Sequence, residues 1–139
     1  MVLVLRAILL LGGLFFVLLG ASFMLDPVVA GGDFGLQARN VQGLSTIRAD
    51  FTAYFLVAGG CMIWGAWARN GDPLLVAAAL MGVTFCGRAI SVYVDGVYDG
   101  FALPMIVEAV TTVLALIGSR LLPHHKLTPA DEEEADKSA

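Results

Sequence analysis

Charge is scarce in this sequence and unevenly placed. Only 14% of the 139 residues are charged and 58% are hydrophobic, whereas an average soluble domain carries about 25% charged residues. Residues 1–122 hold six Arg and seven Asp or Glu, and residues 123–139 hold two Lys and five acids. This composition argues against a soluble domain. It also argues against a nucleic-acid partner, because the chain offers no basic surface.

Metal-ligating and redox side chains are equally sparse. The only cysteines, Cys61 and Cys86, lie in separate apolar runs, and the only histidines, His124 and His125, are adjacent near the C-terminus. Because there is no CxxC spacing, we interpret the cysteines as small packing residues. We therefore expect neither a metal site nor a cofactor.

Long apolar segments are what the sequence does contain. A helix needs roughly 20 apolar residues to cross a hydrocarbon core about 30 Å thick. Four segments meet this requirement, at about residues 2–25, 45–68, 73–94 and 101–122. A signal peptide is the alternative for the first, but its apolar run is longer than the usual 7–15 residues of such a peptide. We predict an all-α membrane protein, a four-transmembrane-helix bundle over residues 1–122.

Polar residues predict where the helices begin. Ser45 or Thr46 is expected to cap the second span, and Asp72 followed by Pro73 to begin the third. The stretch between the first two spans, residues 26–44, is rich in glycine and only weakly apolar. It has room for a short helix lying in the membrane interface.

Basic residues near the ends of the spans predict orientation, because they favour the cytoplasmic side. If the four helices alternate, one side carries Arg6, Arg69, Arg120 and Lys126, and the other carries Arg39 and Arg48. This bias predicts that both termini are cytoplasmic. After Pro123 an acidic run has no apolar surface to bury, and we predict a disordered cytoplasmic tail over residues 123–139.

The third predicted span carries polar residues on one face. They are Thr84, Arg88, Ser91 and Asp95. At 100° per residue these positions fall within about 60° of one another. Small residues lie almost opposite and are expected to pack closely against a neighbouring helix; they are Ala78, Gly82 and Cys86.

The fourth span offers a partner for the arginine. Arg88 is seven residues from Asp95, and Glu108 is seven residues from Phe101. At 1.5 Å per residue both lie roughly 10 Å below the outer surface. An arginine in hydrocarbon costs at least about 2.5–3.5 kcal/mol. We therefore predict an ion pair between Arg88 and Glu108.

The second span adds ionisable residues near its outer end. Arg48 and Asp50 point about 160° apart on a regular helix, so that only one can face the bundle interior. We favour Asp50, with Tyr54 one turn below it.

Residues 47–122 resemble an uncharacterised bacterial family of small four-helix membrane proteins, classed as a domain of unknown function. The string Gly87-Arg88-x-x-Ser91-x-x-x-Asp95-Gly96 carries the resemblance, together with Glu108 and an arginine at the start of the second span. The resemblance implies four helices in the bacterial inner membrane and no established activity.

Two functional hypotheses remain open. The first is an outward-facing polar pocket that binds a lipophilic small molecule or acts on it by acid–base chemistry. Its acid–base candidates are Asp95, Asp50 and Glu108, its orienting cation is Arg88, and its ligand-binding candidates are Ser91, Tyr54, Arg48 and Thr84. In the second, the Arg88–Glu108 pair is only a structural clamp, and glycine-rich faces dock the bundle as an accessory subunit onto a larger membrane complex. The expected partner is membrane lipid, and possible partners are a lipophilic small molecule and either further copies of the chain or a larger membrane complex; no nucleic-acid partner is expected.

Overall fold

The computed structural model describes residues 2–122, and all regular structure in that part of the chain is helical. Four of its helical segments are long and apolar enough to cross a membrane. The chain is therefore an all-α multi-pass membrane protein with four spans, as the apolar runs predicted. The predicted disordered tail, 123–139, lies outside the described residues.

The helical elements follow one another with short connections. They are α1 (Val2–Leu25), α2 (Pro27–Asp33), α3 (Val41–Thr46), the π-helical turn η1 (Ile47–Phe51), α4 (Thr52–Ala68), α5 (Gly71–Asp95) and α6 (Ala102–Leu121). Because α3, η1 and α4 are continuous, the second span runs over Val41–Ala68 and begins earlier than predicted. The glycine-rich stretch predicted to lie between the first two spans contains α2 and the beginning of α3.

Asparagine side chains begin two of the helices. Asn40 Oδ1 accepts a hydrogen bond from the Gly43 N–H at 2.8 Å, so that Asn40 caps α3 and the Ser-Thr pair further on lies inside the helix. Asn70 Oδ1 likewise accepts from the Asp72 N–H at 3.0 Å. Helix α5 consequently starts at Gly71, before the predicted acid and proline. Asparagine is as good an N-cap residue as serine or aspartate. In both helices an asparagine precedes the predicted cap, so the helix begins earlier than predicted.

Glycine allows the closest approach of two helices, α1 and α4. A Cβ atom built on Gly59 would lie 2.5 Å from the Gly13 carbonyl oxygen, and one on Gly13 would lie 2.8 Å from the Gly59 carbonyl oxygen. Nothing larger than hydrogen fits on either residue. Near the start of α1, Arg6 Nε donates to the Ala66 carbonyl at 2.9 Å. This bond satisfies one of the open carbonyls at the end of α4.

The predicted small-residue face of α5 is only partly used for packing. Ala78 is buried, and a Cβ on Gly82 would stand at an ordinary 3.5 Å from the Thr112 side chain. Cys86, one turn further along the same face, is exposed.

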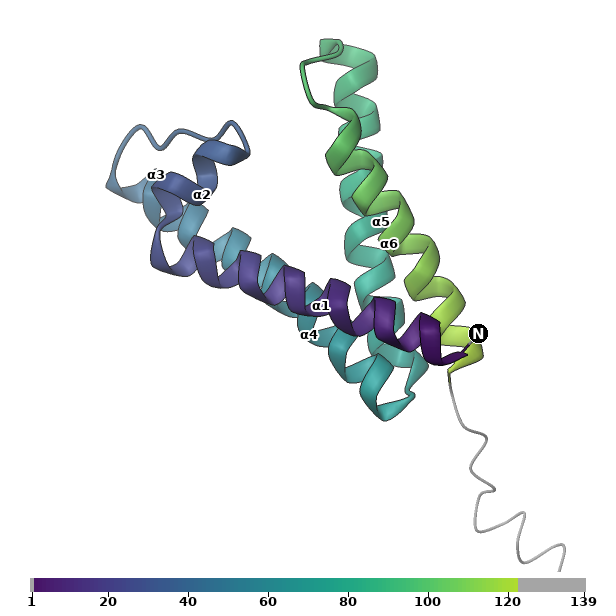
Figure 1. The fold of residues 1–139 in the computed structure, drawn as a ribbon. Helices are drawn as coiled ribbons and strands as arrows, with labels where there is room; N and C mark the ends of the chain where they lie inside the picture. Colours follow the sequence, from purple (N-terminus) through teal and green to yellow (C-terminus); the bar gives the residue numbers. More distant parts are fainter. Residues whose placement is uncertain (1, 123–139) are drawn as a thin grey trace, which may run out of the picture.

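The four spans form two pairs, α1 with α4 and α5 with α6, which meet at one end and diverge toward the other (Figure 1). At the packed end, Leu74 of α5 is completely buried. Glycines on two other helices let it enter: a Cβ would lie 2.5 Å from its side chain if built on Gly65, and 3.1 Å if built on Gly118. At the diverging end, the inner surfaces of the two pairs face each other, and the polar residues of α5 and α6 lie there.

Candidate functional site

An ion pair joins α5 and α6 near the diverging end of the bundle (Figure 1). Arg88 Nε lies 2.6 Å from Glu108 Oε1, and the arginine side chain is 28% exposed while the glutamate side chain is 9% exposed. The two residues project from antiparallel helices at similar depth, which is the relation that their spacing in the sequence implied. The pair neutralises the arginine, whose charge is costly in hydrocarbon.

Arg88 also contacts the loop between α5 and α6. Its Nη1 donates to the Tyr98 hydroxyl at 3.4 Å, which is a long bond. Arg88 Nη2 has no hydrogen-bond partner among residues 2–122. The guanidinium is therefore fixed by one strong bond and keeps donor capacity for a further acceptor.

A second polar contact joins α4 to α5. The Tyr54 and Thr84 hydroxyl oxygens are 2.7 Å apart, and the Thr84 hydroxyl also donates to the Leu80 carbonyl at 2.9 Å. Either hydroxyl can be the donor in this contact, and the Tyr54 hydroxyl also lies 3.5 Å from the Leu80 carbonyl oxygen and 3.6 Å from the Met81 sulfur. As a phenol, Tyr54 can both donate and accept a hydrogen bond.

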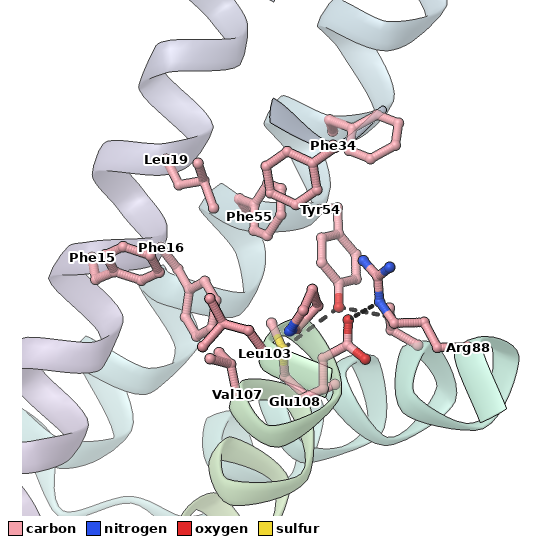
Figure 2. Close-up of a pocket in the computed structure, with 14 residues that line it drawn as sticks. Phe15, Phe16, Leu19, Phe34, Tyr54, Phe55, Arg88, Leu103, Val107 and Glu108 are labelled. Atoms are coloured by element: carbon pink, nitrogen blue, oxygen red, sulfur yellow. Dashed lines mark hydrogen bonds and ion pairs between the residues drawn. The ribbon is translucent and has the colours of Figure 1, made fainter. Parts of the chain in front are cut away.

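A cavity of about 210 Å³ lies between the two helix pairs, and both polar contacts stand in its wall. Its polar lining consists of Tyr54, Thr84, Arg88 and Glu108. Its apolar lining is contributed by every span, and includes Leu19, Met81, Leu103, Pro104 and Val107. Figure 2 shows the charged pair and Tyr54 on one side and Leu103, Val107 and Phe16 on the other. The site is an apolar cavity with one polar wall.

Aromatic rings make up much of the apolar wall. The cavity is lined by Phe15, Phe16, Phe34, Phe51 and Phe55, besides Tyr54. Several of these rings pack on one another, with centroids 6.0 Å apart for Phe16 and Phe55 and 5.8 Å apart for Phe34 and Phe55. Such packed rings form a firm surface on which a flat ligand can lie.

The π-helical turn η1 helps to build this wall. A π-helical turn accommodates one extra residue in a helix and changes the direction of the side chains beyond it, and such turns are frequent at functional sites. Here the turn ends at Phe51, immediately before α4. Phe51, Tyr54 and Phe55 all line the cavity.

The other predicted site residues lie outside the cavity. Ser91 is exposed and lines a separate groove on α5 with Gly87 and Tyr98, which the cavity adjoins at Arg88. Asp50 is exposed in a shallow depression beside Tyr54. Arg48 and Asp95 are exposed near the ends of their helices and line neither the cavity nor the groove. The structure thus brings together four of the eight residues: Tyr54, Thr84, Arg88 and Glu108.

One oxygen of the central carboxylate has no partner. Glu108 Oε2 is buried and makes no hydrogen bond to any of the described residues. Glu108 as a whole is 6% exposed, and leaving a buried polar atom unpaired costs about 1–3 kcal/mol. The polar wall therefore retains unused acceptor capacity.

Sequence reasoning missed the aromatic wall and the contact of Tyr98 with Arg88. The phenylalanines are far apart in the chain and look like ordinary apolar residues of a span. The only feature of the sequence that could have indicated this wall is the number of phenylalanines. Five of the eight line the cavity. Among residues 2–122, no three His, Cys, Asp or Glu side chains gather as a metal site would require.

Comparison with known proteins places the chain in a family without assigning it an activity. No curated protein and no solved structure matches it. One family model, a domain of unknown function termed DUF4345, matches residues 4–119. That match covers most or all of each of the four spans and includes every residue that lines the cavity. The protein therefore belongs to the DUF4345 family of domains of unknown function.

Proposed function

We propose that this protein binds a lipophilic small molecule in the cavity between its two helix pairs, with the polar part of the ligand against Arg88 and Glu108. In this proposal the chain lies in the bacterial inner membrane with both termini cytoplasmic, and the cavity occupies the outward-facing half of the bundle.

One observation supports the proposal above the others: the ion pair and the cavity are present together. If the pair served only to clamp α5 to α6, its surroundings could close completely, as they do around Leu74 at the packed end. Instead, the pair stands in the wall of a cavity of about 210 Å³. Pockets for small molecules have this form, mostly apolar with a few convergent polar groups.

The same geometry narrows any acid–base role. Glu108 is the one carboxylate among the described cavity-lining residues. Asp50 and Asp95 are exposed and do not line the cavity. Proton transfer to or from a bound molecule would therefore fall to Glu108, with Arg88 orienting the carboxylate.

The accessory-subunit alternative has lost part of its basis. It relied on glycine faces of the first two spans as docking surfaces, yet Gly13 and Gly59 contact each other inside the chain. Gly20 and Gly65 are also occupied, by Leu56 and Leu74. Gly60 still supports this alternative, because a Cβ atom added there would meet nothing within 4 Å and a helix of another subunit could pack against it.

Binding can be tested with a variant that fills the cavity. Val107 lines the cavity and is 36% exposed, so that Val107→Trp adds bulk there without entering the core. Val113→Trp is the matched control, because Val113 is on the same helix, is 54% exposed and does not line the cavity. The probes are three para-propylbenzenes with a hydroxyl, methoxy or carboxylate head, titrated into protein in nanodiscs with empty nanodiscs subtracted.

We expect at least one probe to bind the parent protein and Val113→Trp with similar affinity, and to bind Val107→Trp at least about tenfold more weakly, because the indole takes the space of the ligand. If no probe binds the parent beyond its partitioning into lipid, the cavity is not a binding site. Equal binding to both tryptophan variants would contradict the proposed location.

A further inference from the structure

We infer that the ligand of this cavity is a neutral molecule with one ring and a hydroxyl head, held with the hydroxyl against Glu108 and Arg88 and with its tail toward the lipid. This inference rests on the proposed function and specifies the chemical class of the ligand.

Charge balance points to a neutral head. The described charges in the cavity wall are one arginine and one carboxylate, and they are paired at 2.6 Å. An anionic or cationic head would bring a third charge into a low-dielectric site without a counter-charge, which is strongly unfavourable. A neutral head group adds no such penalty.

The hydrogen-bonding groups point to a head that both donates and accepts. Glu108 can only accept as a carboxylate, and the Tyr54 oxygen has lone pairs that can accept as well. Arg88 Nη2 can only donate, and it has no partner among the described residues. A hydroxyl group satisfies both sides with one atom, since its proton can be given to Glu108 or Tyr54 while its oxygen accepts from Arg88. An ether or a hydrocarbon cannot donate.

The size and lining of the cavity point to one ring. Apolar cavities of about 150 Å³ hold benzene. A cavity of about 210 Å³ therefore accommodates a ring with a short substituent. The lining rings of Phe16 and Phe55 are stacked with their planes 12° apart, and they offer a flat ligand ring the offset or edge contacts that aromatic groups prefer.

The rim of the cavity opposite the ion pair is apolar and exposed. Phe15 is 55% exposed, Leu103 is 70% exposed and Val107 is 36% exposed, and all three line the cavity. In a membrane these side chains meet hydrocarbon. A tail attached to the ring opposite its hydroxyl can therefore extend past them into the bilayer.

The three para-propylbenzenes separate this inference from the proposed function. At neutral pH, we expect 4-propylphenol to bind the parent protein about tenfold more tightly than 4-propylanisole, because only the phenol can donate a hydrogen bond to a charged acceptor. The ionised 4-propylbenzoate should bind at least about tenfold more weakly than the phenol, because it carries an uncompensated charge.

A double variant tests whether the charged pair causes the preference. Arg88→Gln combined with Glu108→Gln removes both charges together and leaves neither charge unpaired. Since charge-assisted hydrogen bonds are about twice as strong as neutral ones, the advantage of the phenol over the anisole should fall to about threefold. Tyr93→Phe, at a position that is 91% exposed and outside the cavity lining, should leave that advantage unchanged.

The outcomes are distinguishable. Equal affinity of the phenol and the anisole for the parent overturns the hydroxyl assignment and leaves the cavity as a binding site. Tighter binding of the benzoate than of the phenol overturns the neutral-head assignment. If none of the three binds, both the inference and the proposed function fail.

Discussion

At the scale of residues, the central feature is an arginine that a membrane helix would ordinarily avoid. Arg88 was identifiable from the sequence because a buried charge needs a partner, and Glu108 was identifiable because it lies at the same depth on the next helix. Contacts that depend on side-chain direction were not accessible in this way. Tyr98 looks like an interface aromatic in the sequence, and its hydroxyl contact with Arg88 depends on the course of the loop.

The first prediction concerns the energy that couples the two charges. Arg88→Gln leaves Glu108 without its cation, and Glu108→Gln leaves Arg88 without its anion, so that each single variant retains an unpaired charge. The double variant retains none. We expect the double variant to lose less stability than the sum of the two single losses, by about 1–3 kcal/mol.

This coupling can be measured as a double-mutant cycle from reversible unfolding in mixed detergent micelles. The parallel pair Ser91→Ala and Asp95→Ala, also on α5, serves as a control because no hydrogen bond or ion pair links those two exposed side chains. If the stability lost by the double variant equals the sum of the losses of Arg88→Gln and Glu108→Gln, the interaction between the two charges makes no net contribution to the stability of the protein.

At the scale of elements, the helix positions were predictable and the helix contacts were not. A run of some 20 apolar residues is sufficient to identify a span, and all four spans were found in this way. The close approach of α1 and α4 depends instead on two glycines that happen to meet, Gly13 and Gly59. The neighbouring residues Gly12 and Gly60 are glycines as well. Hydropathy does not indicate which glycine of each helix lies at the contact.

The second prediction uses adjacent glycines of α4. Gly59→Ala places a methyl group 2.5 Å from the Gly13 carbonyl oxygen, and backbone atoms cannot yield cheaply. We expect it to destabilise the protein by about 1–3 kcal/mol or to separate α1 from α4. At Gly60 an added Cβ meets nothing within 4 Å, and Gly60→Ala should be neutral or stabilising by up to about 1 kcal/mol, because alanine favours the helix.

Thermal unfolding of the two variants side by side gives the comparison. The two substitutions are at adjacent positions of the same helix. If α4 were destabilised by any added alanine, the midpoint temperatures of both variants would fall. Equal midpoints for Gly59→Ala and the parent protein would mean that α1 and α4 do not approach as closely as described.

The π-helical turn is the element that sequence reasoning could not have located. Residues 47–51 contain neither proline nor glycine, and the helix continues through them from α3 into α4. A regular helix through this segment would rotate Tyr54 and Phe55 relative to α2 and α3. The aromatic wall therefore depends on a local irregularity that neither composition nor periodicity reports.

At the scale of the whole molecule, the divergence of the two helix pairs creates the cavity. All four spans are apolar enough to cross a membrane, but hydropathy does not determine the angle at which one helix pair leaves the other. The polar residues could be assigned to one end of the bundle, but the space beside them could not. For that reason Asp50 and Asp95, which looked equivalent to Glu108 in the sequence, differ from it in the structure.

The third prediction concerns orientation in the membrane. From the distribution of basic residues, we expect the loop at Asp99 to lie outside and the start of α5 at Asp72 to lie inside. In a variant with Cys61→Ala and Cys86→Ala, a single cysteine introduced by Asp99→Cys should react with a membrane-impermeant maleimide in intact spheroplasts. A cysteine introduced by Asp72→Cys should react only after the membrane is permeabilised. The opposite pattern would invert the topology and turn the cavity toward the cytoplasm.

Locating a bound ligand tests most directly whether the cavity is a ligand site. The probe is 4-propylphenol with a photoreactive diazirine in its propyl chain, activated in nanodiscs and mapped by mass spectrometry of peptides. If the cavity binds the probe, labelling is expected at the cavity rim, within residues 15–19 and 103–107, and excess 4-propylphenol should suppress it. Labelling spread evenly over the lipid-facing surfaces of the spans, and unchanged by the competitor, would contradict the claim that the cavity is a ligand site.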